Sequence, residues 1–126
     1  MTVNTRSFER SAVAGEAMTD KQFYIVQLDA TGKIEVGEGA TDLIVGVLQN
    51  TPDVGEQATY QFLGTAKVKA GGTIAIGAFV TSDTAGKAVA TTTDGDIVIG
   101  RYIGTAAAAD GDLIEVQLCV EHLYIA

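Results

Sequence analysis

An internal repeat limits the fold of this chain more than any other feature of its sequence. When the 126 residues are shifted by 54, residues 29–33 align with residues 83–87, and both read Asp-x-x-Gly-Lys. The apolar segment 43–45 likewise aligns with 97–99, and the register holds without a gap from Val26 to Gly46. Composition alone is the alternative explanation, since Gly and Asp favour turns in any β-protein. We interpret the match as a duplication.

The duplication divides the chain into two similar halves, at approximately residues 14–63 and 70–119. Each half has about 50 residues, and a unit of that size buries too little surface to be stable alone. We therefore expect the halves to share one core within a single domain, residues 13–126.

The body of the chain has the pattern of β-structure. Short segments rich in β-branched and aromatic residues alternate with turns that contain Gly and Asp. The expected strands include residues 23–28, 33–36, 43–48, 58–62, 66–69, 97–99 and 114–120. The run 106–109 supports one helical turn at most. The sequence predicts an all-β fold, either a compact β-barrel or a β-sandwich.

Residues 1–12 fit neither half and are predicted to form an extended N-terminal arm. Residues 1–10 carry one more positive than negative charge, whereas the chain as a whole has a net charge of -8. Such an arm either frays in solution or docks on a neighbouring molecule.

Charge and composition exclude several classes of protein. Eight Lys and Arg residues against sixteen Asp and Glu make a poor binder of nucleic acid or of an anionic membrane surface. The start of the chain has no apolar core of a secretory signal, and no run reaches the roughly 18 apolar residues of a membrane span. The single cysteine, Cys119, has no partner for an internal disulfide and is expected to be an inert thiol in or near the core.

Catalytic motifs are also missing from the sequence. His122 is the only histidine and is expected at the surface or on an edge strand. Neither a Gly-x-Ser-x-Gly nucleophile elbow nor a phosphate-binding Gly-x-x-x-x-Gly-Lys loop occurs. We expect no catalytic site, no cofactor and no metal, and we interpret the paired acids of residues 94–96 and 110–112 as tight turns. Arg101 interrupts an apolar strand and either points to solvent or pairs with an acid at a subunit contact.

The order of turns and strands resembles the capsid cement, or decoration, proteins of tailed bacteriophages. The resemblance covers roughly residues 12–120 and consists of strand and turn patterns. The segments that carry it are Phe23–Leu28, the Asp-x-x-Gly-Lys turn, Leu43–Val47 and Val54–Glu56, with recurrences at Ile97–Arg101 and Asp110–Asp112. In this chain the loop at 106–109 makes the second half two residues longer.

The resemblance implies a structural protein of the virion. Such proteins are made in the host cytoplasm and bind the outer surface of the head, commonly as homotrimers at threefold or quasi-threefold positions between capsomers of the major capsid protein. There they stabilise the shell against the pressure of packaged DNA. Under this interpretation the arm, with Asn4, Arg6, Phe8 and Arg10, contacts the shell or a neighbouring subunit.

Other functions are alternatives. Trimeric tail, baseplate and head-fibre components also use Gly-rich β-domains. A carbohydrate-binding β-sandwich is disfavoured, because the chain has no Trp and only four Tyr for stacking on sugars. An enzyme such as an acid-dependent hydrolase has no motif in its favour.

Overall fold

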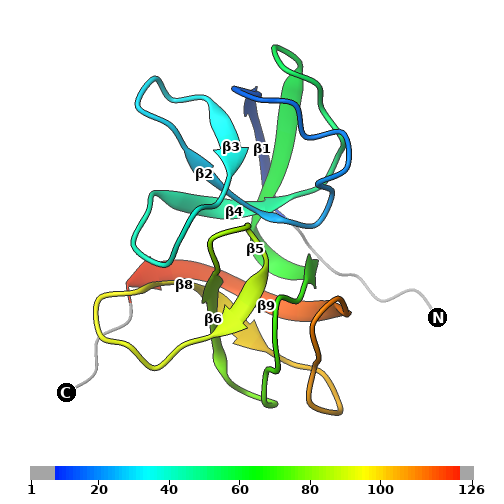
Figure 1. The fold of residues 1–126 in the computed structure, drawn as a ribbon, viewed down its shortest axis with the longest axis vertical. Coiled ribbons are helices and arrows are strands. Elements are labelled where there is room, and N and C mark those ends of the chain that lie inside the picture. Colours follow the sequence, from blue (N-terminus) through cyan, green and yellow to red (C-terminus); the bar gives the residue numbers. More distant parts are fainter. Residues whose placement is uncertain (1–7, 123–126) are drawn as a thin grey trace.

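The computed structural model describes residues 8–122, which form one curled antiparallel sheet of nine strands (Figure 1). No helix occurs among these residues, so the prediction of an all-β fold is confirmed. The strands are β1 (Phe8–Val13), β2 (Ile25–Leu28), β3 (Ile34–Val36), β4 (Ile44–Leu48), β5 (Gln57–Lys69), β6 (Phe79–Ser82), β7 (Ala88–Ala90), β8 (Ile97–Tyr102) and β9 (Leu113–His122).

The sheet is arranged as two lobes joined by β5. Lobe 1, residues 8–63, has the strand order β3-β2-β4-β5-β1 and is the upper part of Figure 1. Lobe 2, residues 64–122, has the order β7-β6-β8-β9-β5 and is the lower part. The 13-residue β5 belongs to both lobes, and it crosses between them at Gly64, whose φ of 92° is readily adopted only without a Cβ. The two strands expected at 58–62 and 66–69 are therefore one.

Each lobe curls until its two ends approach. A parallel bridge joins Ala14, just after β1, to Ile34 in β3. The matching bridge in lobe 2 joins Ala70, just after β5, to Ala88 in β7. The architecture is therefore a single sheet curled as a half-barrel in each lobe, and not a sandwich of two stacked sheets.

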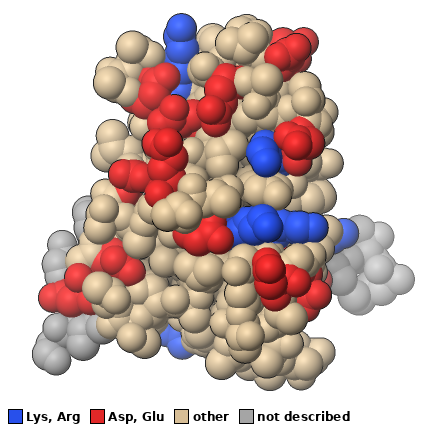
Figure 2. Space-filling view, viewed as in Figure 1, with Lys and Arg blue, Asp and Glu red and all other residues tan. Residues whose placement is uncertain are grey.

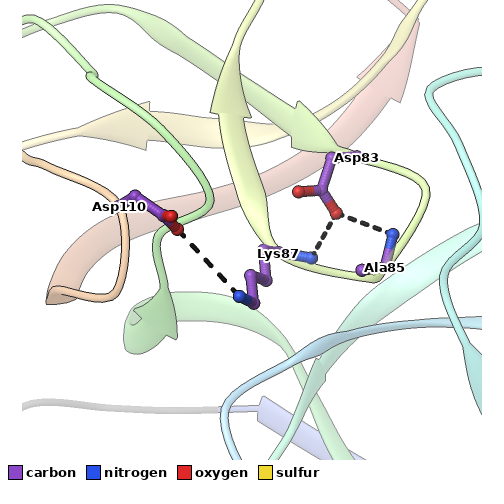
Figure 3. A network of polar contacts seen from close by, with 4 residues as sticks. All are labelled: Asp83, Ala85, Lys87 and Asp110. Carbon is purple, nitrogen blue, oxygen red and sulfur yellow. Dashed lines mark hydrogen bonds and ion pairs between the residues drawn. The ribbon is translucent and has the colours of Figure 1, made fainter.

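The β2–β3 and β6–β7 turns are held by the same side-chain hydrogen bonds. In both, an aspartate oxygen accepts from the N–H groups two and four residues later, which closes the turn. These bonds run to Asp29 Oδ1 from Thr31 and Lys33 (2.8 and 3.0 Å), and to Asp83 Oδ1 from Ala85 and Lys87 (2.8 and 2.9 Å; Figure 3). The Thr31 hydroxyl also donates to Asp29 Oδ1 (2.7 Å), and this bond, with the two N–H groups, lowers the pKa of Asp29.

A glycine lies within β4 and β8 at matching positions, where the neighbouring strand passes very close. A Cβ built on Gly46 would be 2.2 Å from the Gln61 carbonyl oxygen. One on Gly100 would be 1.9 Å from the Gln117 carbonyl oxygen. Both contacts are with backbone atoms, so no side-chain rotation relieves them.

The buried apolar residues form two clusters. The lobe 1 cluster is built on Ala14, Met18, Val26, Ile34, Leu48, Ala58 and Tyr60. The second cluster fills lobe 2, and three residues of lobe 1 join it: Ile25, Ile44 and Val47. The lobes therefore share part of one core.

Lobe 2 packs against one face of lobe 1 through its β6–β7 turn and the start of β8. The Ile25 N–H donates to the Gly86 carbonyl oxygen (2.7 Å), and the Ile97 N–H donates to the Ala40 carbonyl oxygen (2.7 Å). A Cβ on Gly86 would be 2.4 Å from Val36 Cγ1, so the turn lies directly against lobe 1.

Two local expectations need correction. Residues 8–12 of the predicted arm lie in the sheet, because β1 pairs antiparallel with β5 from Phe8 to Val13. Cys119 is exposed rather than in the core, because Ile114, Val116 and Leu118 occupy the inward positions of β9.

Candidate interaction surface

The outward side chains of lobe 2 form a continuous surface across β5, β9, β8 and β6. The strand register places Leu63 beside Cys119, and Thr65 beside Gln117. Gln117 is in turn opposite Arg101. We call this surface the outer face of lobe 2 and define it by Phe79, Arg101, Ile103, Gln117 and Cys119, together with Leu63, the last residue of lobe 1.

A shallow groove of about 430 Å³ runs over this outer face. The residues that line it include Phe79, Val98, Gly100, Arg101 and Gln117. The Arg101 guanidinium lies 4.4 Å from the centroid of the Phe79 ring, and its Nη1 donates to the Gly77 carbonyl oxygen (3.2 Å). Within one chain Arg101 is therefore an exposed cation held in place by a cation–π contact.

Large apolar side chains are exposed on both lobes. Those of lobe 2 include Ile103 (42% exposed) and Leu113 (49%), and Leu63 (41%) lies at the junction of the lobes. In lobe 1, Leu43 and Val54 are each 63% exposed. Exposed apolar groups of this size are common at binding surfaces when they lie together, and Leu63 and Phe79 line the same groove on the outer face of lobe 2.

The two lobes differ in charge. Residues 8–63 contain nine Asp and Glu against three Lys and Arg, whereas residues 64–122 contain seven against four. Figure 2 shows one side of the whole molecule. On that side, acidic side chains are spread over the upper and lower parts, and most of the basic ones lie near the middle. Lobe 1 is thus the more strongly negative end of the molecule.

The structure describes two of the four residues predicted to make contacts. Phe8 is 49% exposed and its ring centroid is 6.4 Å from that of Phe62. Arg10 is exposed and lies opposite Tyr60 in the β1–β5 register. Asn4 and Arg6 lie outside the described residues.

Polar groups in the described part of the chain serve turns and packing. No group of three or more His, Cys, Asp or Glu side chains there could hold a metal ion. The ion pair Lys87 Nζ–Asp110 Oδ1, at 4.0 Å, is partly exposed and joins two neighbouring loops (Figure 3). A second groove of about 480 Å³ lies between residues 102–107 and 112–115, and Asp112 in its lining accepts a hydrogen bond from the Ala109 N–H. Residues 8–122 contain no helix with the length and hydropathy of a membrane span.

These features define a β-protein whose conspicuous surfaces are suited to binding. Residues 20–118 match the family model described as phage cement protein, and the chain belongs to this family. The family predicted from the sequence is thereby confirmed, and the protein is a structural protein of the phage head, associated with the capsid.

A solved structure has the same fold. It is the head fiber gp8.5 N base of bacteriophage phi29, with a TM-score of 0.64 and 19% sequence identity. The match covers 95% of this chain and 100% of that one. No curated protein matches the chain. Sequence reasoning missed the outer face of lobe 2, although the outward positions of the 114–120 strand, Glu115, Gln117 and Cys119, were visible in its alternation.

Proposed function

We propose that the protein is a decoration protein that binds the outer surface of the head at threefold or quasi-threefold positions. Its partners there are the major capsid protein and two further copies of itself, as a homotrimer. By bridging capsomers it stabilises the shell against the pressure of packaged DNA. The match of residues 20–118 to the cement family carries this proposal.

The surface chemistry supports an outer position. A net charge of -8 disfavours contact with packaged DNA, because phosphate binding depends on clustered Lys and Arg. Several subunits attached to one lattice point also let modest individual contacts add up to tight binding. We assign no catalytic function to the chain.

The repeat supports a simple origin for the fold. We infer that lobe 1 and lobe 2 derive from one ancestral unit that was duplicated. The matching turns at Asp29 and Asp83, the matching glycines Gly46 and Gly100, and the same strand order in both lobes favour this inference.

The binding test uses purified protein and empty expanded heads of the phage that encodes it. We expect saturable co-sedimentation with close to three copies per threefold position. DNA-filled heads that lack the protein, tested separately, should release their DNA at a higher temperature after it is added. Heads that bind no protein, or bind it without any gain in stability, would contradict the proposal.

The N-terminal segment is proposed as part of the contact with the shell or a neighbouring subunit. Because Phe8–Val13 is a strand of the sheet, the informative deletion removes residues 1–7, including Asn4 and Arg6, and leaves β1 in place. We expect this deletion, and separately Arg10→Glu, to weaken binding to heads while the circular dichroism spectrum is unchanged. Lys21→Glu makes the same change in charge elsewhere on lobe 1 and is the matched control; equal binding by all variants would refute the contact.

A head-fibre component is the second candidate, and its fold likeness to a head fiber N base favours it. A map of the intact virion separates the two functions. Density for this chain at the foot of a projecting fibre would support the second candidate, whereas compact density lying on the shell would support decoration.

A further inference from the structure

One face of lobe 1 is covered by lobe 2 of the same chain. Ile25, Ile44 and Val47 form this face, with exposures of 0%, 5% and 0%, and they pack within the core of lobe 2. Gln61, beside them on β5, is 4% exposed. We call this face the receiving surface of lobe 1. Lobe 2 of the same chain occupies it.

The matching face of lobe 2 is open. The residues at the corresponding positions of β6, β8 and β9 are Phe79, Val98, Arg101 and Gln117, and they line the outer-face groove. Val98 is buried, like its counterpart Ile44, but Phe79 is half-buried, and Arg101 and Gln117 are exposed, although their counterparts in lobe 1 are buried. Lobe 2 therefore repeats the receiving surface without an occupant among the described residues.

The part of lobe 2 that packs on the receiving surface, which we call the inserting surface, has an uncovered counterpart on lobe 1. In lobe 2, Gly86 is buried against Val36, and Ile97 packs on the shared core. The matching residues of lobe 1 are Gly32, which has no atom within 4 Å of its Cβ position, and Leu43, which is 63% exposed. Lobe 1 therefore carries a free copy of the inserting surface.

We propose that lobe 1 of one copy docks on the outer face of lobe 2 of a second copy, repeating between chains the contact that joins the two lobes within a chain. Leu43 and the Gly32 turn enter the groove lined by Phe79, Val98 and Arg101. This inference rests on the homotrimer in the proposed function and identifies the surfaces that form it.

The chemistry of the two surfaces is complementary. Leu43 meets the apolar part of the groove, and the exposed Arg101 faces the more acidic lobe, where Asp29 lies in the docking turn. The contact is head-to-tail, so it closes only if successive copies are related by a rotation that completes a ring. Three copies related by 120° satisfy this condition and produce the proposed trimer.

The test alters each surface separately and measures molar mass by light scattering after size-exclusion chromatography. Leu43→Lys places a charge on the inserting surface beside Arg101, and Gln117→Trp fills the groove at an exposed strand position. We expect wild type to elute as a trimer and each variant as a monomer. Val54→Lys and Gln57→Trp are the matched controls, at exposed positions of lobe 1 outside both surfaces, and should remain trimeric.

Mixing the two variants tests the head-to-tail geometry. A Gln117→Trp copy has an intact inserting surface, and a Leu43→Lys copy has an intact groove, so an equimolar mixture should form dimers and no trimer. Variants that stay trimeric, or a mixture that stays monomeric, would overturn the assigned surfaces. A monomeric wild type would also overturn the proposed homotrimer. Binding of the protein to heads is measured in a separate experiment, so the decoration function can hold or fail whatever the outcome of this one.

Discussion

The turns at Gly32 and Gly86 have the same sequence pattern and the same aspartate hydrogen bonds, but their surroundings are opposite. Gly86 is buried against lobe 1, and Gly32 is exposed. The local sequence therefore determines the shape of the turn, while its position in the chain determines whether anything packs on it. A similar contrast holds for Val47, which is fully buried, and its counterpart Arg101, which is exposed.

The interiors of the lobes also differ in how side-chain volume is divided between two inward positions of the same strand. On β5, lobe 1 has the small Ala58 next to the large Tyr60, two residues along the same face. The corresponding residues of β9 are Ile114 and Val116, which divide the volume more evenly. Cores tolerate such exchanges when the total volume is kept.

The largest expected effect is a loss of stability on truncating one core side chain in each lobe, which also tests whether the two lobes unfold together. Met18 and Ile74 occupy matching positions and are both fully buried. Met18→Ala and Ile74→Ala should each lower the free energy of unfolding by about 4 kcal/mol, through lost burial and the cavity left behind. Because Ile25, Ile44 and Val47 join the lobe 2 core, each variant should show one cooperative transition in calorimetry. Two transitions, with only one shifted in each variant, would show that the lobes are independent.

The next effect tests the close approach of strands in both lobes. Gly46→Ala and Gly100→Ala should each cost about 3 kcal/mol, because the added methyl group meets a backbone carbonyl that cannot move aside. Chemical denaturation of each variant measures this loss. Gly39→Ala is the control, since its Cβ would be 3.6 Å from Asp42 Oδ2, an ordinary contact, and it should change stability little. A small loss of unfolding free energy at only one of the two glycines would mean that the strands approach less closely in that lobe.

These contrasts also show how far the sequence predicts the fold. The turns at Asp29 and Asp83 and the apolar strands expected at 43–48 and 97–99 were predicted, because their signals are local: Gly, Asp and runs of apolar residues. The structure has these strands at 44–48 and 97–102. The strand β1 was missed, because its residues are mostly polar and exposed, and only the free edge of β5 makes them a strand. No local pattern reports such an edge.

The candidate surface was less predictable for the same reason. Arg101 was recognised as unusual, but its contact with Phe79 depends on the pairing of β6 with β8. The exposure of Leu43 can be interpreted only by comparison with Ile97, 54 residues later, which is partly buried against the shared core. The repeat aligns these two residues in the sequence, whereas their difference in exposure results from the packing of lobe 2 on lobe 1.

A smaller effect compares the two turns directly. Gly32 and Gly86 have φ angles of 81° and 80°, so alanine at either position should cost about 1 kcal/mol in backbone strain. Gly86→Ala should cost about 1.5 kcal/mol more than Gly32→Ala, because only its methyl group collides with Val36. Thermal unfolding in the Leu43→Lys background keeps assembly out of the comparison. Equal losses at the two positions would argue against the close packing of lobe 2 on lobe 1.

The smallest effect is the pH response of the partly exposed Asp29. Its hydrogen bond from the Thr31 hydroxyl has no counterpart at the Asp83 turn, where Ala85 occupies the matching position. Because the pKa of Asp29 is lowered on folding, its contribution to stability is present above the ordinary pKa of Asp and is lost as pH falls through the lower folded value. Thr31→Ala removes the hydroxyl donor and should raise the pKa of Asp29 towards its ordinary value, as measured by NMR titration of the carboxyl carbon. Thr41→Ala, an exposed threonine outside the turn, should leave that pKa where it was. If Thr31→Ala also left it unchanged, the N–H groups common to both turns would account for the lowered pKa, and this difference between the lobes would have no electrostatic consequence.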